Sequence, residues 1–296
     1  MIGRAILWIA ALVVAGSSSP VLAKDALVLE PSSRWELDYA ADSCALRRMF
    51  GEGAQQSQLE IRRFQPGLSL QTTVATRAMP MTRRNFRYRF DPNPEWQDAA
   101  AANYVYFGDN FEGVIFYPQL PDLVVDKKKD DDELRQDFTT ADLVAMEAKA
   151  AQGIESITMS RAFRDDLVLK TGSLGAPLIA LNACIDELLG HWGIDVEAHK
   201  TLTRPAIAKN VSKMGRLIPY PPKMLAQRLP GIVNVRLEVG ETGAVNGCHI
   251  QMELSDPAFE EASCKTLQKS LKFDPALDKD GKPIASYWIN RVRFNP

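Results

Sequence analysis

The sequence predicts an α+β protein: a mainly-β N-terminal domain with two helices, followed by a small domain with the order strand, strand, helix, strand. The chain of 296 residues is long enough for two ordinary domains, and 46% hydrophobic with 24% charged residues is a soluble globular balance. Apolar and polar residues alternate in short segments of the first part of the chain. The end of the chain carries a hairpin pattern, a capped amphipathic helix and a closing strand.

The charge balance argues against nucleic acid as a partner. The formal net charge is −2, and no strongly basic run offsets it. Sequence-independent attraction to nucleic acid or to an anionic membrane requires a basic surface. The sequence therefore predicts that nucleic acid is not a partner.

The N-terminus has the pattern of a secretory signal peptide over residues 1–23. Arg4 precedes an apolar run from Ile6 to Gly16, and the segment ends in the small-residue pattern Val21-Leu22-Ala23. This run is shorter than the roughly 20 residues that a membrane-spanning helix needs. We expect cleavage after Ala23 and export; the alternative is an uncleaved anchor in the inner membrane.

Residues 24–195 are predicted to form the mainly-β domain of unknown function. Alternating patterns predict strands at 35–39, 86–90, 104–107, 114–117 and 167–169. Thr139 and Asp142 have the spacing of a capping box that starts a first helix. The mixed charge run at 127–133 is typical of a solvated loop. A second helix is predicted from Pro177 to about Gly190, with one apolar stripe formed by Leu178, Leu181, Cys184, Ile185 and Leu188.

Residues 196–216 read as a linker, and the small domain follows at 217–296. A strand from Ile232 to Val239 alternates cleanly, and Gly240-Glu241-Thr242-Gly243 forms the turn of a hairpin. The second strand places Cys248, Ile250, Met252 and Leu254 on its apolar face. Ser255-Asp256-Pro257 starts a helix whose stripe contains Cys264, Leu267 and Leu271. The last strand is predicted from Ser286 to Phe294.

The four cysteines form an even set in a chain that we expect to be exported, which favours disulfides. Cys248 and Cys264 both point into the layer between hairpin and helix, so we predict a bridge worth about 3 kcal/mol. Cys184 faces the core of the first domain, and Cys44 is its remaining candidate partner. That bridge would close a loop of 140 residues and contribute about 5 kcal/mol. The alternative for each pair is two buried thiols.

Residues 217–296 resemble the C-terminal domain of TonB-type energy transducers. The resemblance rests on the order and spacing of Tyr220-Pro221, Gly231-Ile232-Val233, Gly243-Ala244-Val245, Phe273-Asp274-Pro275-Ala276 and Asp280-Gly281-Lys282-Pro283. One departure lies after the second strand, where the family commonly has Ser-Ser-Gly and this chain has Glu253-Leu254-Ser255-Asp256. The chain also lacks the Pro, Lys and Glu-rich spacer of the family.

The resemblance implies a periplasmic domain that binds an extended segment of an outer-membrane transporter by strand addition along its last strand. Carried over to this chain, the candidate binding residues, which we name the partner strip, are Tyr287, Trp288, Ile289, Asn290, Arg291, Val292 and Arg293. The alternatives are that these side chains pack in their own core, or that the strand pairs with a second copy in a homodimer.

The sequence supplies little for catalysis. His191, His199 and His249 lack metal-ligand spacing, and none accompanies a nucleophile motif. We therefore expect no enzyme activity, no cofactor and no metal, and a binding protein that contacts an outer-membrane transporter or another envelope protein, with a role in TonB-dependent transport. Two alternatives remain at this point: a membrane-anchored energy transducer, and an N-terminal enzyme domain with a TonB-like docking unit.

Overall fold

The computed structural model describes residues 26–82, 85–99, 102–107, 111–121, 123, 137–209, 211, 214–252 and 256–296. The predicted signal peptide at 1–23 and the charge run at 127–133 lie outside the described residues. The described chain contains two separate hydrophobic cores, one formed between Leu29 and Leu188 and the other between Ala206 and Phe294. We name the parts around them the N-terminal unit and the C-terminal unit. The mixture of helix and strand is that of an α+β protein.

Two β-sheets pack against each other in the N-terminal unit. One sheet has the order β1 (Leu27–Leu29), β11 (Leu167–Leu169), β10 (Ser156–Ser160), β6 (Arg87–Asp91) and β7 (Gln97–Asp98). The other has the order β2 (Glu36–Ala40), β3 (Ser43–Phe50), β4 (Ser57–Arg63), β5 (Gln71–Thr76), β9 (Phe111–Phe116) and β8 (Asn103–Phe107). Rings from both sheets meet in the core, where Phe86 lies 5.3 Å from Phe116.

Two long helices and one short turn complete this unit. They are α2 (Thr140–Gln152), α3 (Gly175–His191) and the 3₁₀ helix η1 (Gly53–Gln55). The capping box predicted at the start of α2 is present, because Thr139 Oγ1 accepts from the backbone N–H of Asp142 while the Asp142 carboxylate accepts from the backbone N–H of Thr139. α3 begins at Gly175, two residues before the predicted start, and every member of its predicted stripe is buried.

The central strands β3, β4 and β5 were not predicted from the sequence. β5 is the clearest case, since it contains one glutamine and three threonines yet all six of its residues are buried. On one face of this strand, Val74 packs into the core of the N-terminal unit. The other face is covered by the C-terminal unit, because Gln71 and Thr73 line a cavity together with Gln251. A polar strand covered on both faces has no alternating pattern to detect.

The segment at 196–216, predicted as a linker, is packed where it is described. It contains α4 (Val196–Lys200), β12 (Ile207–Ala208) and the start of α5 (Met214–Leu217). Leu202 and Ala206 join the C-terminal core. The Thr203 N–H donates to the Leu277 carbonyl at 3.0 Å, and β12 pairs with β15 (Phe273–Asp274). The segment therefore does not reach away from either unit.

The C-terminal unit is a three-stranded antiparallel sheet with one long helix on its apolar face. The strand order is β14 (Val245–Met252), β13 (Gly231–Val239) and β18 (Ser286–Phe294). The helix α7 (Pro257–Ser270) packs on the sheet through Phe259 and Leu267. The remaining short elements are α6 (Pro222–Ala226), β16 (Ala276–Leu277) and β17 (Pro283–Ile284). The order strand, strand, helix, strand is the predicted one.

Both disulfides are present with the pairing that the sequence predicts. Cys248 of β14 is joined to Cys264 of α7, with 5.7 Å between their Cα atoms. Cys44 of β3 is joined to Cys184 of α3, with 6.2 Å between Cα atoms. Each bridge thus connects a sheet to the helix that covers it.

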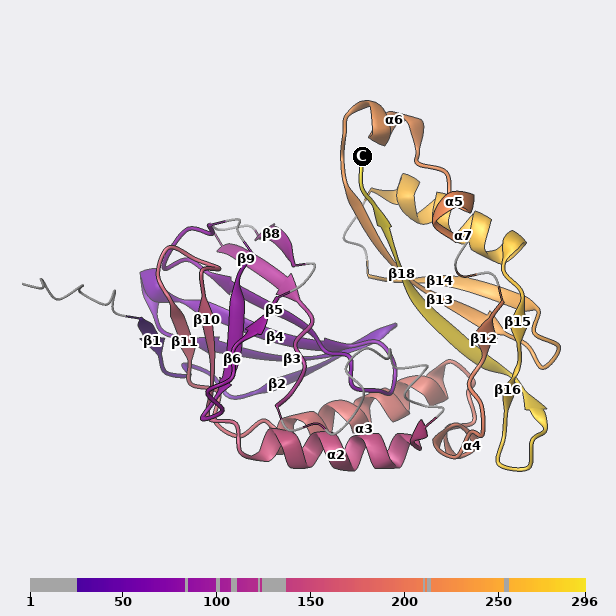
Figure 1. The fold of residues 1–296 in the computed structure, drawn as a ribbon, viewed down its shortest axis with the longest axis horizontal. Helices are drawn as coiled ribbons and strands as arrows, with labels where there is room; N and C mark the ends of the chain where they lie inside the picture. The colour runs from indigo at the N-terminus through magenta and orange to yellow at the C-terminus, as the bar shows by residue number, and fades with distance from the viewer. Residues whose placement is uncertain are drawn as a thin grey trace, which may run out of the picture.

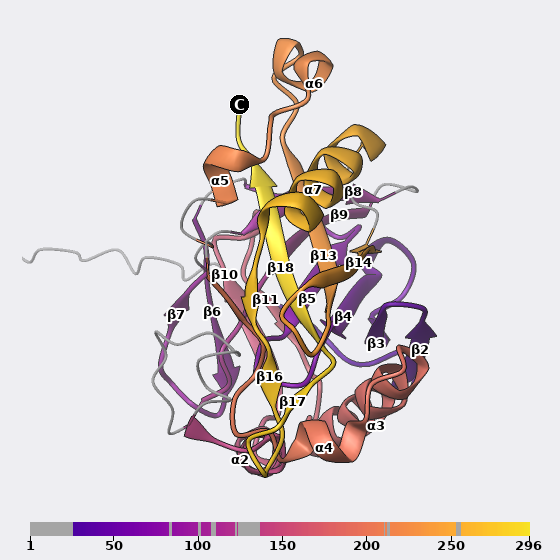
Figure 2. The same ribbon diagram turned by 90° about the vertical axis from the view of Figure 1, so that its right-hand side faces the viewer.

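The two units lie side by side. In Figure 1 the three-stranded sheet stands next to the N-terminal unit, and α7 lies on the side of this sheet that faces away from it. Figure 2 gives the view from that side, with α7 in front of β18 and the strands of the N-terminal unit behind. The polar face of the three-stranded sheet is consequently turned towards the N-terminal unit. Within the described parts of the chain, no helix is both long enough and apolar enough to span a bilayer.

Candidate partner-binding strand and domain interface

The partner strip lies on β18, which is an edge strand. β18 pairs with β13 over its full length, from Ser286 opposite Val239 to Phe294 opposite Gly231, without a register shift. In the described chain, β13 is the only strand paired with β18. The other edge of β18 therefore presents backbone groups that no strand pairs.

Three even-numbered side chains of β18, Trp288, Val292 and Phe294, belong to the core of the C-terminal unit. Trp288 lies 5.4 Å from the Phe273 ring, and Phe294 lies 4.5 Å from the Phe259 ring. Val292 is buried in the same core. These side chains hold β18 against α7, so they are not available to a partner.

Odd-numbered side chains of β18 face the N-terminal unit. The Tyr287 ring lies 5.6 Å from Trp192 at the end of α3, and it stacks on His199 of α4 at 5.9 Å. The Arg291 guanidinium lies 3.6 Å from the centre of the Tyr117 ring, which follows β9. Arg293 is exposed. Most side chains of the partner strip are thus already in contact with the protein itself.

Arg291 is a cation held without a carboxylate among the described residues. Its Nε donates to Asn234 Oδ1 at 3.2 Å, and its remaining contact is the Tyr117 ring. Burial lowers the pKa of Arg291. Burial also raises the pKa of Tyr117, and the positive charges of Arg291 and Arg293 oppose that rise. The partner strip therefore holds a buried positive charge at Arg291, which lies against the ring of Tyr117.

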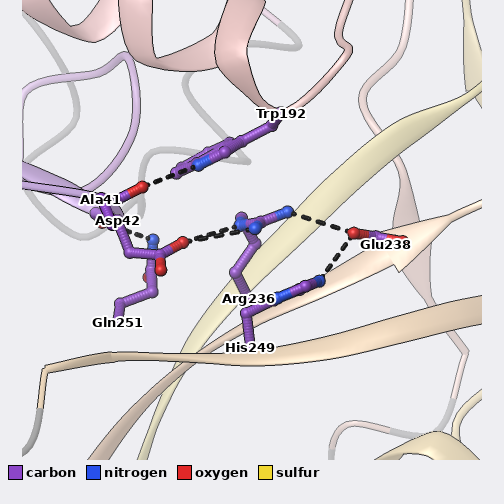
Figure 3. Close-up of polar contacts among 7 residues, drawn as sticks. All are labelled: Ala41, Asp42, Trp192, Arg236, Glu238, His249 and Gln251. Atoms are coloured by element: carbon purple, nitrogen blue, oxygen red, sulfur yellow. Dashed lines mark hydrogen bonds and ion pairs between the residues drawn. The ribbon is translucent and has the colours of Figure 1, made fainter.

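A polar cluster joins the two units beside the strip, as Figure 3 shows. Arg236 of β13 is 3.3 Å from the Asp42 carboxylate, and its guanidinium lies 4.1 Å from the centre of the Trp192 ring. The Trp192 indole N–H donates to the Ala41 carbonyl at 3.3 Å. The Gln251 side-chain amide donates to the Asp42 carbonyl at 3.1 Å. Charged, aromatic and amide contacts therefore fix the hairpin β13–β14 to the loop between β2 and β3.

Glu238 extends this cluster towards solvent. Its carboxylate lies 3.6 Å from Arg236 and 2.6 Å from His249 Nε2, as drawn in Figure 3. Glu238 and His249 are both partly exposed, so this contact contributes little to stability. Arg236 is 5% exposed and carries the buried part of the contact.

The sequence pattern placed Asn234, Arg236 and Glu238 on the polar face of a half-buried strand, but the N-terminal unit covers that face. Asn234 and Arg236 are buried in the structure. The covering residues Trp192 and Tyr117 were not predicted as part of the site. The one signal was the double-sided apolar pattern of the last strand, which indicates a covered face without identifying what covers it.

One serine–histidine pair lies at the start of β18. Ser286 Oγ is 3.0 Å from His199 Nε2, and His199 Nδ1 is 2.9 Å from the Asp195 carbonyl. The adjoining cavity measures about 10 Å³, which is room for at most one water molecule. In the described residues, no group of three or more His, Cys, Asp or Glu side chains is placed to hold a metal. The pair links α4 to the start of β18.

The comparison with known families agrees with this architecture. Residues 217–296 match the sequence profile described as Gram-negative bacterial TonB protein C-terminal. Residues 217–296 form a TonB C-terminal domain. This TonB C-terminal domain includes the whole three-stranded sheet and α7. Among curated proteins and solved structures, none matches the chain significantly.

Proposed function

We propose that this protein is an exported TonB-like binding protein of the cell envelope. Its TonB C-terminal domain captures an extended segment of an outer-membrane transporter by adding that segment to β18. The observation that supports this is the nine-residue edge of β18, which has β13 as its only strand partner in the described chain. The proposal includes no catalytic step and no cofactor.

Strand addition fits the way in which the side chains of β18 are used. Backbone N–H and C=O groups on an open edge bind any extended chain, and neighbouring side chains add selectivity. Because Trp288 is in the core and Tyr287 is held by Trp192, these side chains add little selectivity. Arg293 is the exposed charged member of the strip. We infer that the backbone supplies most of the affinity and Arg293 a smaller part.

The proposed location is the periplasm, after cleavage of residues 1–23. If residues 1–23 are not cleaved, the protein would instead be an energy transducer that is anchored in the inner membrane by its N-terminal segment. The mature N-terminus distinguishes the two, since an exported protein begins at Lys24 and an anchored one retains Met1.

A pair of proline substitutions tests strand addition. Successive residues of an edge strand direct their N–H groups alternately to the paired strand and outwards. Of Ile289→Pro and Asn290→Pro, one removes a bond to β13 and destabilises the domain, whereas the other removes an outward donor and leaves it folded. We expect the proline variant that stays folded to lose its capture of the transporter from solubilised outer membranes. Arg293→Ala should only weaken this capture.

The thermal unfolding profile of each variant shows which proline is tolerated. Arg216→Ala on α5 is the matched control for Arg293→Ala, because it removes an exposed arginine that is not part of the partner strip. Transporter capture by the tolerated proline variant at the level of the unsubstituted protein would exclude strand addition at β18. Capture of a second copy of the chain alone would assign the edge to a homodimer.

A further inference from the structure

A cavity lined by both apolar and polar side chains lies between the six-stranded sheet and the C-terminal unit. Its volume is about 350 Å³, within the range of small-ligand pockets. Most of its wall is the outward face of β3, β4 and β5, and one wall residue comes from β14. The lining residues that carry hydrogen-bonding groups are Ser43, Arg47, Gln58, Glu60, Arg62, Gln71, Thr73 and Gln251.

A second cavity of about 530 Å³ adjoins the first, since Ile115 lines both. It lies between Asn103 to Val105 of β8 and the facing ends of β13 and β18. Arg293 contributes the charge of this second cavity. We name the two cavities together the interdomain cleft. Clefts between domains are a preferred place for ligand sites.

Two buried polar side chains line the cleft with hydrogen-bonding capacity unused. Thr73 is 8% exposed, and its hydroxyl makes no hydrogen bond among the described residues. Gln251 is 6% exposed, and its Oε1 has no hydrogen-bond partner, whereas its amide nitrogen is held by the Asp42 carbonyl. Unsatisfied buried polar groups are costly and therefore uncommon. Here they come from opposite walls, one from each unit.

Ordered charges complete the wall. The Glu60 carboxylate accepts from Arg47 at 2.7 Å and from Arg62 at 3.0 Å, while Arg62 also donates to Ser43 Oγ at 2.6 Å. Burial raises the pKa of Glu60, but these two arginines outweigh it and lower the pKa overall. Glu60 is therefore a fixed anion. Asp38, outside the lining, also pairs with Arg47 at 2.9 Å.

The cleft retains an excess of positive charge. Arg47 and Arg62 are balanced by Glu60 and Asp38, but Arg293 has no carboxylate partner among the described residues. An anionic group of a ligand would pair with Arg293 on the arginine side of the cleft. The ligand would also supply an N–H or O–H donor for the Gln251 oxygen and an acceptor for Thr73.

We propose that the interdomain cleft binds a short peptide that carries a carboxylate. A peptide supplies N–H donors and C=O acceptors at regular spacing, and an acidic residue or a free C-terminus supplies the anion. A neutral saccharide offers hydroxyl groups but nothing to neutralise Arg293. Arg293 lines the cleft and also belongs to the partner strip, whereas Thr73 and Gln251 lie outside the strip. The effect of Thr73→Val therefore tests the cleft separately from strand addition.

Calorimetric titration of the mature protein with defined peptides tests this site. We expect saturable binding of Ala-Glu-Ala-Glu, and binding at least tenfold weaker for Ala-Gln-Ala-Gln, because a hydrogen bond to a charged group is lost. The acidic peptide is also tested with its N-terminus acetylated and its C-terminus amidated. If this capped peptide binds as tightly as the free one, the natural ligand is a segment within a protein. If capping abolishes binding, the natural ligand is a free oligopeptide. Binding of maltotriose in preference to the acidic peptide, or no saturable binding, would overturn the proposal.

Two matched pairs of variants locate the binding. Thr73→Val should weaken the acidic peptide about threefold to tenfold, the value of one neutral hydrogen bond. Thr72→Val is its control, because Thr72 is the adjacent buried threonine, also lacks a partner for its hydroxyl, and does not line the cleft. Arg293→Gln should weaken binding at least tenfold, and Arg216→Gln should not change it. Equal effects within either pair would place the peptide outside the cleft.

Discussion

At the scale of single residues, Gly243 shows how the hairpin turn is tied to the rest of the TonB C-terminal domain. Its φ is +78°, and a Cβ added there would lie 2.1 Å from the Phe273 carbonyl oxygen. The Gly243 carbonyl itself accepts from the Phe273 N–H at 3.2 Å. Only glycine allows both the left-handed backbone and this close approach to β15.

We predict that Gly243→Ala lowers the free energy of unfolding by clearly more than Gly281→Ala does. Gly281 also has a positive φ, +75°, but nothing lies within 4 Å of its added Cβ. Gly281→Ala therefore costs only the backbone strain, about 1–2 kcal/mol. Chemical unfolding followed by circular dichroism measures both, and equal losses would show that the turn does not press against β15.

The Cys248–Cys264 bridge and the helix cap could be predicted from sequence because each depends on local spacing. Thr139 and Asp142 stand three positions apart, and Cys264 lies on the stripe that faces Cys248. Contacts such as Arg291 on Tyr117 join residues distant in the sequence, and no local pattern specifies them.

At the scale of elements, several strands were predicted close to their observed bounds, but β4 was missed although its burial alternates. The last strand spans Ser286–Phe294 in the structure as in the prediction, because its apolar side chains meet α7. β5 could not be predicted, since both of its faces are buried although it is rich in threonine. The same polar face of the six-stranded sheet became the wall of the interdomain cleft. An element that serves a site therefore loses the pattern that would reveal it.

For the pairing of β14 with α7, we predict that the double variant Cys248→Ala/Cys264→Ala destabilises the C-terminal unit by about 3 kcal/mol, because the unfolded chain gains loop entropy. Differential scanning calorimetry should show a lower unfolding temperature for this unit. The double variant Cys44→Ala/Cys184→Ala serves as the comparison and should affect the N-terminal unit, by about 5 kcal/mol. An unchanged C-terminal transition in the first variant would show that the bridge does not hold helix and sheet together.

At the scale of the whole molecule, the two units are joined by a polar and aromatic interface. Trp192 is central to it, because its ring contacts both Arg236 at 4.1 Å and Tyr287 at 5.6 Å. These contacts hold β13 and β18 against the end of α3. The interface therefore fixes the position of the edge strand β18 relative to the N-terminal unit.

We predict that Trp192→Ala lets the units separate while each stays folded. Small-angle scattering should report a larger radius of gyration, and calorimetry should resolve two transitions. Trp96→Ala is the matched control, since Trp96 stacks with Arg87 at 4.5 Å inside the N-terminal unit and should leave the pair of units compact. A radius unchanged in Trp192→Ala would mean that other contacts hold the units together.

The capture of a partner strand by β18 is tested most directly by photo-crosslinking in cells. A photoreactive amino acid at Arg293 reports what lies beside the strip, and the same amino acid at Ile179, an exposed site on α3, serves as the control. The account predicts a crosslink from position 293, absent from position 179, to an extended periplasmic segment of an outer-membrane transporter. A crosslink from position 293 only to the N-terminal unit, or to a second copy of the chain, would contradict it.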